Sequence, residues 1–244
     1  MRNTRIYTST ALHSGADFVL EPEPSRHLSR SLRLGEGDAL TLFDGSGGEY
    51  SASIMDVGKK HVTVRTGQHQ NIDRESALAI HLGIAVSRGD RFDWVIQKAT
   101  ELGATSISPL QTERTGVRLS GERAEKKLSH WRQIAISACE QCGRNRLPAL
   151  NPLQSLQSWI DATQADQRLV LHHRAAANLE TTEQPGSIAL LVGPEGGLSE
   201  AEIEQAQRSG YFSLTLGPRI MRTETAPLAA LAILQSRWGD MAPR

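Results

Sequence analysis

The chain has 244 residues, of which 39% are hydrophobic and 22% are charged, as in ordinary globular proteins. Its 27 basic and 27 acidic residues cancel, so the overall charge does not point to nucleic acid as a partner. No apolar run is long enough to span a membrane, and the amino terminus lacks the apolar core of a secretory signal. We therefore expect a cytoplasmic protein that does not bind membranes.

The first seventy or so residues are typical of β-structure. Short alternating runs at Ala39–Phe43, Tyr50–Met55 and His61–Arg65 are separated by glycine-rich turns. Strands at such close spacing predict a small barrel.

One helix is expected inside this region, at about Ser25–Leu34. Arg26, Arg30 and Arg33 fall at positions i, i+4 and i+7, which puts them on one helical face, with Leu28 and Leu32 on another. Such a face either contacts RNA phosphates or is only solvated.

From Leu78 onward, apolar strands alternate with helices, which predicts an α/β domain with a mostly parallel sheet. The polar stretch Gln68–Ser76 is the expected boundary, which gives domains at residues 1–72 and 73–244. The expected strands are Leu78–Val86, Ser106–Leu110, Arg168–Leu171, Ile188–Val192 and Phe212–Leu216, and the helices begin after Asp90 and at Glu122, Ser199 and Pro227.

The two cysteines, Cys139 and Cys142, form a single Cys-x-x-Cys pair late in a helical pattern. A structural zinc site needs four ligands, so we expect ordinary packing and no metal. The loop that follows carries Arg144, Asn145 and Arg146 between a glycine and a proline, a composition that suits contacts with RNA phosphates and base edges.

The segment Leu190–Glu202 is an apolar strand, a glycine-rich turn and a helix start, in which Ser199 and Glu202 have capping-box spacing. In α/β proteins this geometry brings backbone amides close to a ligand. A carboxylate at Glu195 disfavours pyrophosphate and favours a neutral or cationic nucleotide-like ligand, which S-adenosylmethionine fits. The alternative is a tight turn without a ligand.

A second strand, turn and helix follow at Leu214–Pro227, with Arg219, Arg222 and Glu224 in the loop. The two turns are expected to form two walls of one pocket, in which an arginine stabilises negative charge on a substrate. The alternative is a surface pair of Arg222 and Glu224 beside helix caps. Gly-x-Gly-x-x-Gly, P-loop and Gly-x-Ser-x-Gly motifs do not occur, which disfavours dinucleotide redox chemistry, P-loop hydrolysis and serine hydrolase activity.

Taken together, these segments resemble the RsmE family of SPOUT-class RNA methyltransferases. The resemblance extends in order over nearly the whole chain, and Met221 is its one mild departure, at a position that is usually aliphatic. The matching segments are Arg5–Tyr7, His27–Asp38, Asp93–Gly103, Glu140–Arg144, Gly193–Ser199 and Leu216–Ala226.

The resemblance implies an amino-terminal PUA-like β-barrel that binds RNA and a carboxy-terminal SPOUT domain with a trefoil knot. It also implies a homodimer that uses S-adenosyl-L-methionine to methylate N3 of one uridine, conventionally numbered 1498, in 16S ribosomal RNA of the small subunit. Two other classes remain: a non-catalytic RNA-binding protein, and a metabolic enzyme that acts on another nucleotide.

On this reading Arg222 stabilises the uridinate oxygens, and Glu224 or Glu195 accepts the proton. The expected cofactor-binding residues are Leu171, His172, Val192, Gly193, Pro194, Glu195, Gly196, Gly197, Leu216, Gly217, Ile220, Met221 and Arg222. The expected RNA-binding residues are Arg5, Arg26, Arg30, Arg33, Arg144, Asn145 and Arg146.

Overall fold

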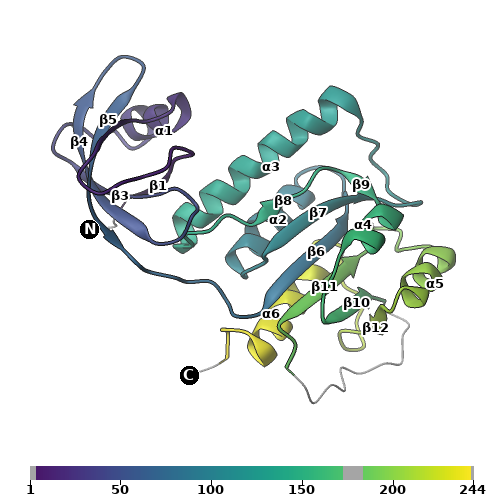
Figure 1. Ribbon diagram of the computed structural model, residues 1–244. Coiled ribbons are helices and arrows are strands. Elements are labelled where there is room, and N and C mark those ends of the chain that lie inside the picture. The colour runs from purple at the N-terminus through teal and green to yellow at the C-terminus, as the bar shows by residue number, and fades with distance from the viewer. Residues whose placement is uncertain (1–3, 173–183, 243–244) are drawn as a thin grey trace. The chain divides into compact units, whose positions relative to one another are not determined.

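The computed structural model describes residues 4–172 and 184–242 (Figure 1). The chain forms two compact units: unit 1 comprises Met1–Glu75 with Cys139–Leu147, and unit 2 comprises Ser76–Ala138 with Pro148–Arg244. The sequence pattern did not indicate that the segment Cys139–Leu147 packs with the first seventy-five residues. The domain boundary between residues 72 and 73 stays a prediction.

Unit 1 is built on a five-stranded sheet with the order β1-β3-β4-β5-β2. β1 pairs with β3 in parallel, and the other neighbours are antiparallel. Its core is apolar, with Leu28, Leu42 and Val64 fully buried. The strands are β1 (Arg5–Tyr7), β2 (Asp17–Val19), β3 (Ala39–Phe43), β4 (Glu49–Val57) and β5 (Val62–Gln70).

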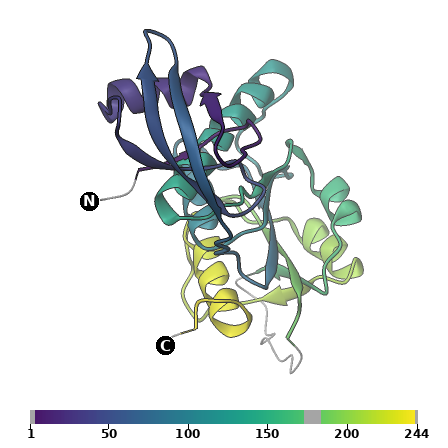
Figure 2. The ribbon, with the colours of Figure 1, turned by 60° about the vertical axis from the view of Figure 1, so that its left-hand side comes forward.

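The helix expected over Ser25–Leu34 is wrong in its bounds and regularity. It begins earlier, as α1 (Pro22–Arg26), and continues as a π-helical turn over His27–Ser31 beside the β4–β5 hairpin (Figure 2). Ser25 fixes its position, because its hydroxyl accepts a hydrogen bond from the Val62 amide at 3.0 Å. A π-turn adds a residue to the turn, so the i, i+4, i+7 spacing no longer defines one face.

The sheet of unit 2 has seven strands, in the order β12-β10-β11-β6-β7-β8 with β9 also paired to β7. All of these pairings are parallel, as the alternation of strands and helices predicted. The strands are β6 (Ala79–Ala85), β7 (Ser106–Gln111), β8 (Ala149–Leu150), β9 (Gln154–Ser155), β10 (Gln167–Leu171), β11 (Ser187–Val192) and β12 (Phe212–Leu214).

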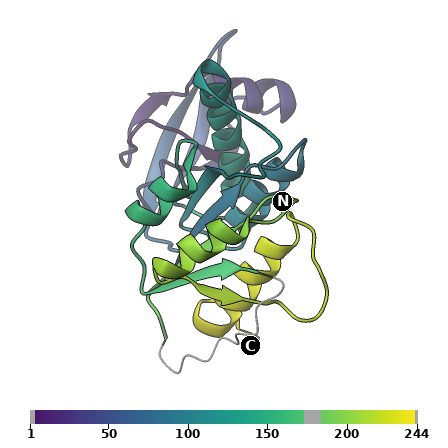
Figure 3. The same cartoon turned by 90° about the vertical axis from the view of Figure 1, so that its right-hand side faces the viewer.

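Helices cover both faces of this sheet (Figure 3). Alternate residues of β11 enter two cores: Leu190 packs with α2, α3 and α6, whereas Leu191 packs with α4 and α5. Both faces are therefore apolar, as in doubly covered parallel sheets. The helices are α2 (Arg91–Glu101), α3 (Gly121–Cys142), α4 (Leu156–Ala162), α5 (Glu200–Arg208) and α6 (Ala226–Trp238).

Local signals placed most helix ends correctly. The Ser199–Glu202 capping box is present at the start of α5, and Gly103 follows α2 with a φ of 79°. Asp90 is the N-cap residue of α2, but its side chain makes no capping hydrogen bond. Within the described part of the chain, no helix combines the length and apolar character needed to cross a membrane.

Candidate active site

The carboxyl ends of three neighbouring strands of unit 2 open into one cavity. β10, β11 and β12 end at Leu171, Val192 and Leu214, and these three residues line a cavity of about 1090 Å³. The loops Gly193–Gly197 and Leu216–Glu224 supply much of its wall. Ligands of open α/β sheets bind at this end of the strands, so the two sequence segments singled out for ligand binding meet where a ligand is expected.

The glycine-rich loop after β11 has a shape that its neighbours fix. A Cβ atom at Gly193 would lie 2.9 Å from the backbone nitrogen of Leu198, closer than real Cβ contacts. Gly197 closes a turn by donating its amide to Pro194 O at 2.8 Å, with a φ of 69°. The Arg114 guanidinium donates to Gly196 O at 3.1 Å from outside the loop. Glycine at residue 193 is therefore a steric requirement of this loop.

The second loop is tied to the first and to α6. The Thr223 hydroxyl donates to Gly193 O at 3.2 Å, which joins the two loops directly. The Arg222 carbonyl accepts the amides of Thr225 and Ala226, both at 2.9 Å, so the backbone of Arg222 is held at the start of α6. Its guanidinium is exposed and, among the described residues, forms no ion pair. The surface pair of Arg222 with Glu224 considered from the sequence is therefore not formed.

Glu195 and Glu224 both face Arg91, the first residue of α2. Arg91 Nη1 lies 3.3 Å from Glu195 Oε1, and Arg91 Nε lies 4.0 Å from Glu224 Oε1. The Arg88 amide also donates to Glu195 Oε1, at 3.2 Å. The carboxylate in the glycine-rich loop is thus compensated by a cation from a different part of the chain.

Comparison with known proteins places the chain in a family. Residues 74–235 match the RNA methyltransferase domain model, and residues 20–67 match the RNA methyltransferase PUA domain model. The Bacillus subtilis ribosomal RNA small subunit methyltransferase E is 31% identical over 237 residues, which cover 93% of each chain. This protein belongs to the RsmE family. A relative of the same name from Buchnera aphidicola of Schizaphis graminum is 32% identical and covers 98% of both chains.

Two solved structures have folds similar to that of this chain. A methyltransferase from Legionella pneumophila, in complex with S-adenosylmethionine, has a TM-score of 0.95 and 41% identity over 98% of this chain and 100% of its own. The Neisseria gonorrhoeae ribosomal RNA small subunit methyltransferase E, also bound to S-adenosylmethionine, has a TM-score of 0.93 and 40% identity over 99% and 100%. The PUA-like unit and the α/β methyltransferase unit expected from the resemblance are both present.

Every residue predicted to bind the cofactor of this RsmE-family protein lines the cavity, and so does Glu224. Their roles stay predictions. The sequence did not single out Arg91 and Arg114, which reach the cavity from α2 and from the loop after β7. Arg91 and Arg114 are far along the chain from both loops, so no motif or regular spacing in the sequence connects them with the site. Only the fold shows that their side chains reach it.

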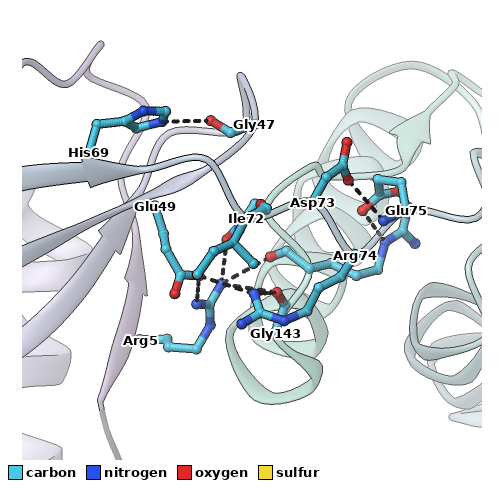
Figure 4. A network of polar contacts seen from close by, with 11 residues as sticks. Arg5, Gly47, Glu49, His69, Ile72, Asp73, Arg74, Glu75 and Gly143 are labelled. Carbon is cyan, nitrogen blue, oxygen red and sulfur yellow. Dashed lines mark hydrogen bonds and ion pairs between the residues drawn. The ribbon is translucent and has the colours of Figure 1, made fainter.

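The predicted RNA-binding residues separate into two groups in unit 1. Arg5 and Arg74 converge on Glu49 (Figure 4), where the Arg5 side chain is 12% exposed. Arg5 Nη2 also donates to Asn145 Oδ1 at 2.6 Å, and Arg74 Nη1 donates to Gly143 O at 2.8 Å. These contacts join β1, β4 and the segment Cys139–Leu147 into one network, in which Arg5 and Glu49 are largely buried and Arg74 is 42% exposed.

Arg144 and Asn145 belong to the same network. Arg144 forms a two-armed ion pair with Glu75, with Nε 3.0 Å from Oε1, and its side chain is only 6% exposed. Asn145 is buried and donates to Ile72 O at 2.8 Å. Arg5, Arg144 and Asn145 therefore make polar contacts within the protein, and their contact with RNA stays a prediction.

The other predicted RNA-binding residues of this RsmE-family protein lie on the surface. Arg26, Arg30 and Arg146 are exposed. Arg33 is also exposed, but it lies beyond the π-turn with a φ of 56°, so it is not on the helical face that the spacing predicted. For these four arginines, contact with RNA stays a prediction.

Of the two cysteines, Cys139 is buried and Cys142 is half-buried. Cys139 is fully buried, and its thiol lies 3.6 Å from Arg146 O. Burial raises the pKa of the Cys139 thiol to about 12, so it stays protonated at neutral pH and is a poor nucleophile.

Proposed function

We propose that this protein transfers a methyl group from S-adenosylmethionine to N3 of uridine 1498 in 16S ribosomal RNA, as a cytoplasmic homodimer acting on the small ribosomal subunit. The observation that carries the proposal is the cavity at the ends of β10, β11 and β12, where both ligand-binding loops predicted from the sequence meet. Family membership supports methyl transfer to ribosomal RNA. The choice of nucleotide rests on the resemblance.

The residues around the cavity fit the proposed cofactor. The cavity is as large as typical small-molecule sites, and the position where a Cβ would stand at Gly197 is open space. Both carboxylates and guanidinium groups line the wall, which suits a ligand that carries charges of both signs, as the sulfonium and the amino-acid part of S-adenosylmethionine do. Relatives with 40% and 41% identity hold S-adenosylmethionine. When bound, this cofactor supplies a methyl group on a positively charged sulfur, which keeps the electron pair of the broken C–S bond.

The side chains of the second loop supply the remaining chemistry in this proposal. Glu224 or Glu195 accepts the N3 proton of uridine, and the electron pair of the N–H bond forms the new bond to the methyl carbon. Arg222, whose guanidinium carries no ion pair among the described residues, stabilises the negative charge on the uridine oxygens. Removing one such electrostatic stabiliser typically lowers the rate about a hundredfold.

The deciding experiment is transfer of labelled methyl from S-adenosylmethionine to small ribosomal subunits that lack the modification, with mapping of the product nucleotide. We expect label at N3 of a single 16S uridine. Arg222→Ala should lower turnover about a hundredfold while leaving fold and cofactor binding intact. Cofactor binding without transfer would refute this substrate. Absence of both would leave a non-catalytic RNA-binding protein. Light scattering in solution tests the homodimer.

A further inference from the structure

The proposed function leaves open whether Glu224 or Glu195 accepts the N3 proton. Arg91 lies close to both carboxylates. We infer that Arg91 is a positioning residue that holds Glu195 as part of the cofactor loop and leaves Glu224 to accept the N3 proton. The inference rests on the proposed function. It gives a role to Arg91, which the sequence pattern did not single out, and it means that Glu195 does not accept the proton.

The Glu195 carboxylate already accepts two hydrogen bonds. Its Oε1 accepts the Arg88 amide at 3.2 Å and lies 3.3 Å from Arg91 Nη1. These two donors occupy the acceptor positions of one carboxylate oxygen and hold the Glu195 carboxylate in one orientation. The same bonds connect the chain after β6 to the loop after β11, across 107 residues of sequence. Glu195 therefore serves to hold the glycine-rich loop in place.

Glu224 lies near the same arginine but accepts no hydrogen bond from it. The 4.0 Å separation from Arg91 Nε is longer than a hydrogen bond but close enough for charge attraction. Among the described residues, no group donates a hydrogen bond to the Glu224 carboxylate. It lies two residues before the start of α6. Among the described residues, the Glu224 oxygens are thus available to accept a proton.

Glu224 lies in the same loop as Arg222, two residues further along the chain. Arg222 and Glu224 lie on either side of Thr223, whose hydroxyl binds Gly193 O. The group that stabilises charge and the group that takes the proton are therefore attached to the cofactor loop through one residue. The Glu224 side chain is 21% exposed, against 34% for Glu195, so Glu224 is also the better shielded from water.

The step is balanced in atoms and charge. The N3 proton moves to Glu224, which becomes neutral, and the N–H electron pair forms the N–C bond. The C–S electron pair neutralises the sulfonium sulfur of the cofactor. One negative and one positive charge are lost together, and Glu224 afterwards returns its proton to solvent. No other co-reactant is needed.

Four variants of the full-length protein test the assignment: Glu224→Gln, Glu195→Gln, Arg91→Gln and Arg91→Lys. Two quantities are measured for each. The dissociation constant for S-adenosylhomocysteine is obtained by calorimetry, and the single-turnover methylation rate on small subunits is followed from pH 6 to 9. Melting curves exclude variants that fail to fold. Arg132→Gln, at an exposed position on α3, is the matched control for affinity.

We expect Glu224→Gln to keep its S-adenosylhomocysteine affinity and to lose about 10²- to 10⁴-fold in rate, with a flattened pH profile. Glu195→Gln and Arg91→Gln should bind S-adenosylhomocysteine about tenfold more weakly, and Arg91→Lys should recover part of that loss. A rate loss at normal affinity in Glu195→Gln, with Glu224→Gln still active, would overturn the assignment. So would normal affinity and a normal pH profile in Arg91→Gln. Failure of the proposed function is seen separately, because wild-type protein would then not label the uridine.

Discussion

Replacing Arg144 by alanine distinguishes a structural arginine from one that binds RNA. The substitution removes both arms of the ion pair with Glu75 and leaves that carboxylate in a site where its side chain is 20% exposed. Removing one partner of a buried pair typically costs about 3–5 kcal/mol, because the remaining charge is unpaired. Glu75 keeps some contact with water, so we expect a loss of about 3 kcal/mol.

That loss is large enough to measure directly. For a domain of the size of unit 1, about 1 kcal/mol corresponds to roughly 4–8 °C in Tm, so the transition that includes unit 1 should fall by about 10 °C or more. Calorimetry and urea unfolding give the change. Arg146→Ala is the matched control from the same segment: its side chain is exposed, so its stability should change by less than about 0.5 kcal/mol.

A double variant separates pairing from packing. Arg144→Met with Glu75→Leu removes both charges and should recover much of the stability lost by Arg144→Ala, since buried ion pairs are often replaceable by apolar groups. The reasoning is refuted if Arg144→Ala melts within about 1 °C of wild type and loses RNA affinity instead. Arg144 would then be an RNA contact, as its sequence context first indicated.

Three further predictions concern the glycine loop, acid stability and RNA. Gly193→Ala should shift the loop, lower the melting temperature and weaken S-adenosylhomocysteine binding about tenfold by calorimetry. Gly196→Ala, whose Cβ would meet only Arg114 at an ordinary 3.5 Å, should lower the melting temperature less than Gly193→Ala does; equal changes in melting temperature would contradict a steric requirement at residue 193. Burial alone would raise the pKa of Glu49, but hydrogen bonds from Arg5 and Arg74 outweigh it and lower that pKa. The ionised Glu49 therefore stabilises the folded protein above pH 4.5, and this stabilisation is lost as the pH falls through the lowered pKa of the folded state. The free energy of unfolding of Glu49→Gln should consequently depend less on pH below 4.5 than that of the wild type. An unchanged pH dependence would mean that other groups cause the acid sensitivity. Arg30→Ala with Arg33→Ala should weaken RNA binding and reduce the slope of log affinity against log salt by about two; an unchanged slope would show that these arginines are only solvated.

Local patterns in the chain determined most of the secondary structure of unit 2. Apolar runs such as Ile188–Val192 predict strands that are buried on both faces, and this one forms nearly all of β11. The Ser199–Glu202 spacing predicts a helix start because the side chains satisfy backbone groups within one turn. Both signals lie within a few residues. The same is true of the glycine-rich turn after β11, which is why this loop could be predicted as a candidate cofactor site without the fold.

Only the tertiary structure decided which charges meet. Arg91 and Glu195 are 104 residues apart, and Arg144 and Glu75 are 69 apart, so no local spacing records either pair. An exposed arginine and a buried, paired one have the same letter in the sequence, because burial depends on what the rest of the chain places around it. The chain by itself specified the strands, turns and loops of the site. The fold determined which arginines are paired within the protein and which remain available for substrate.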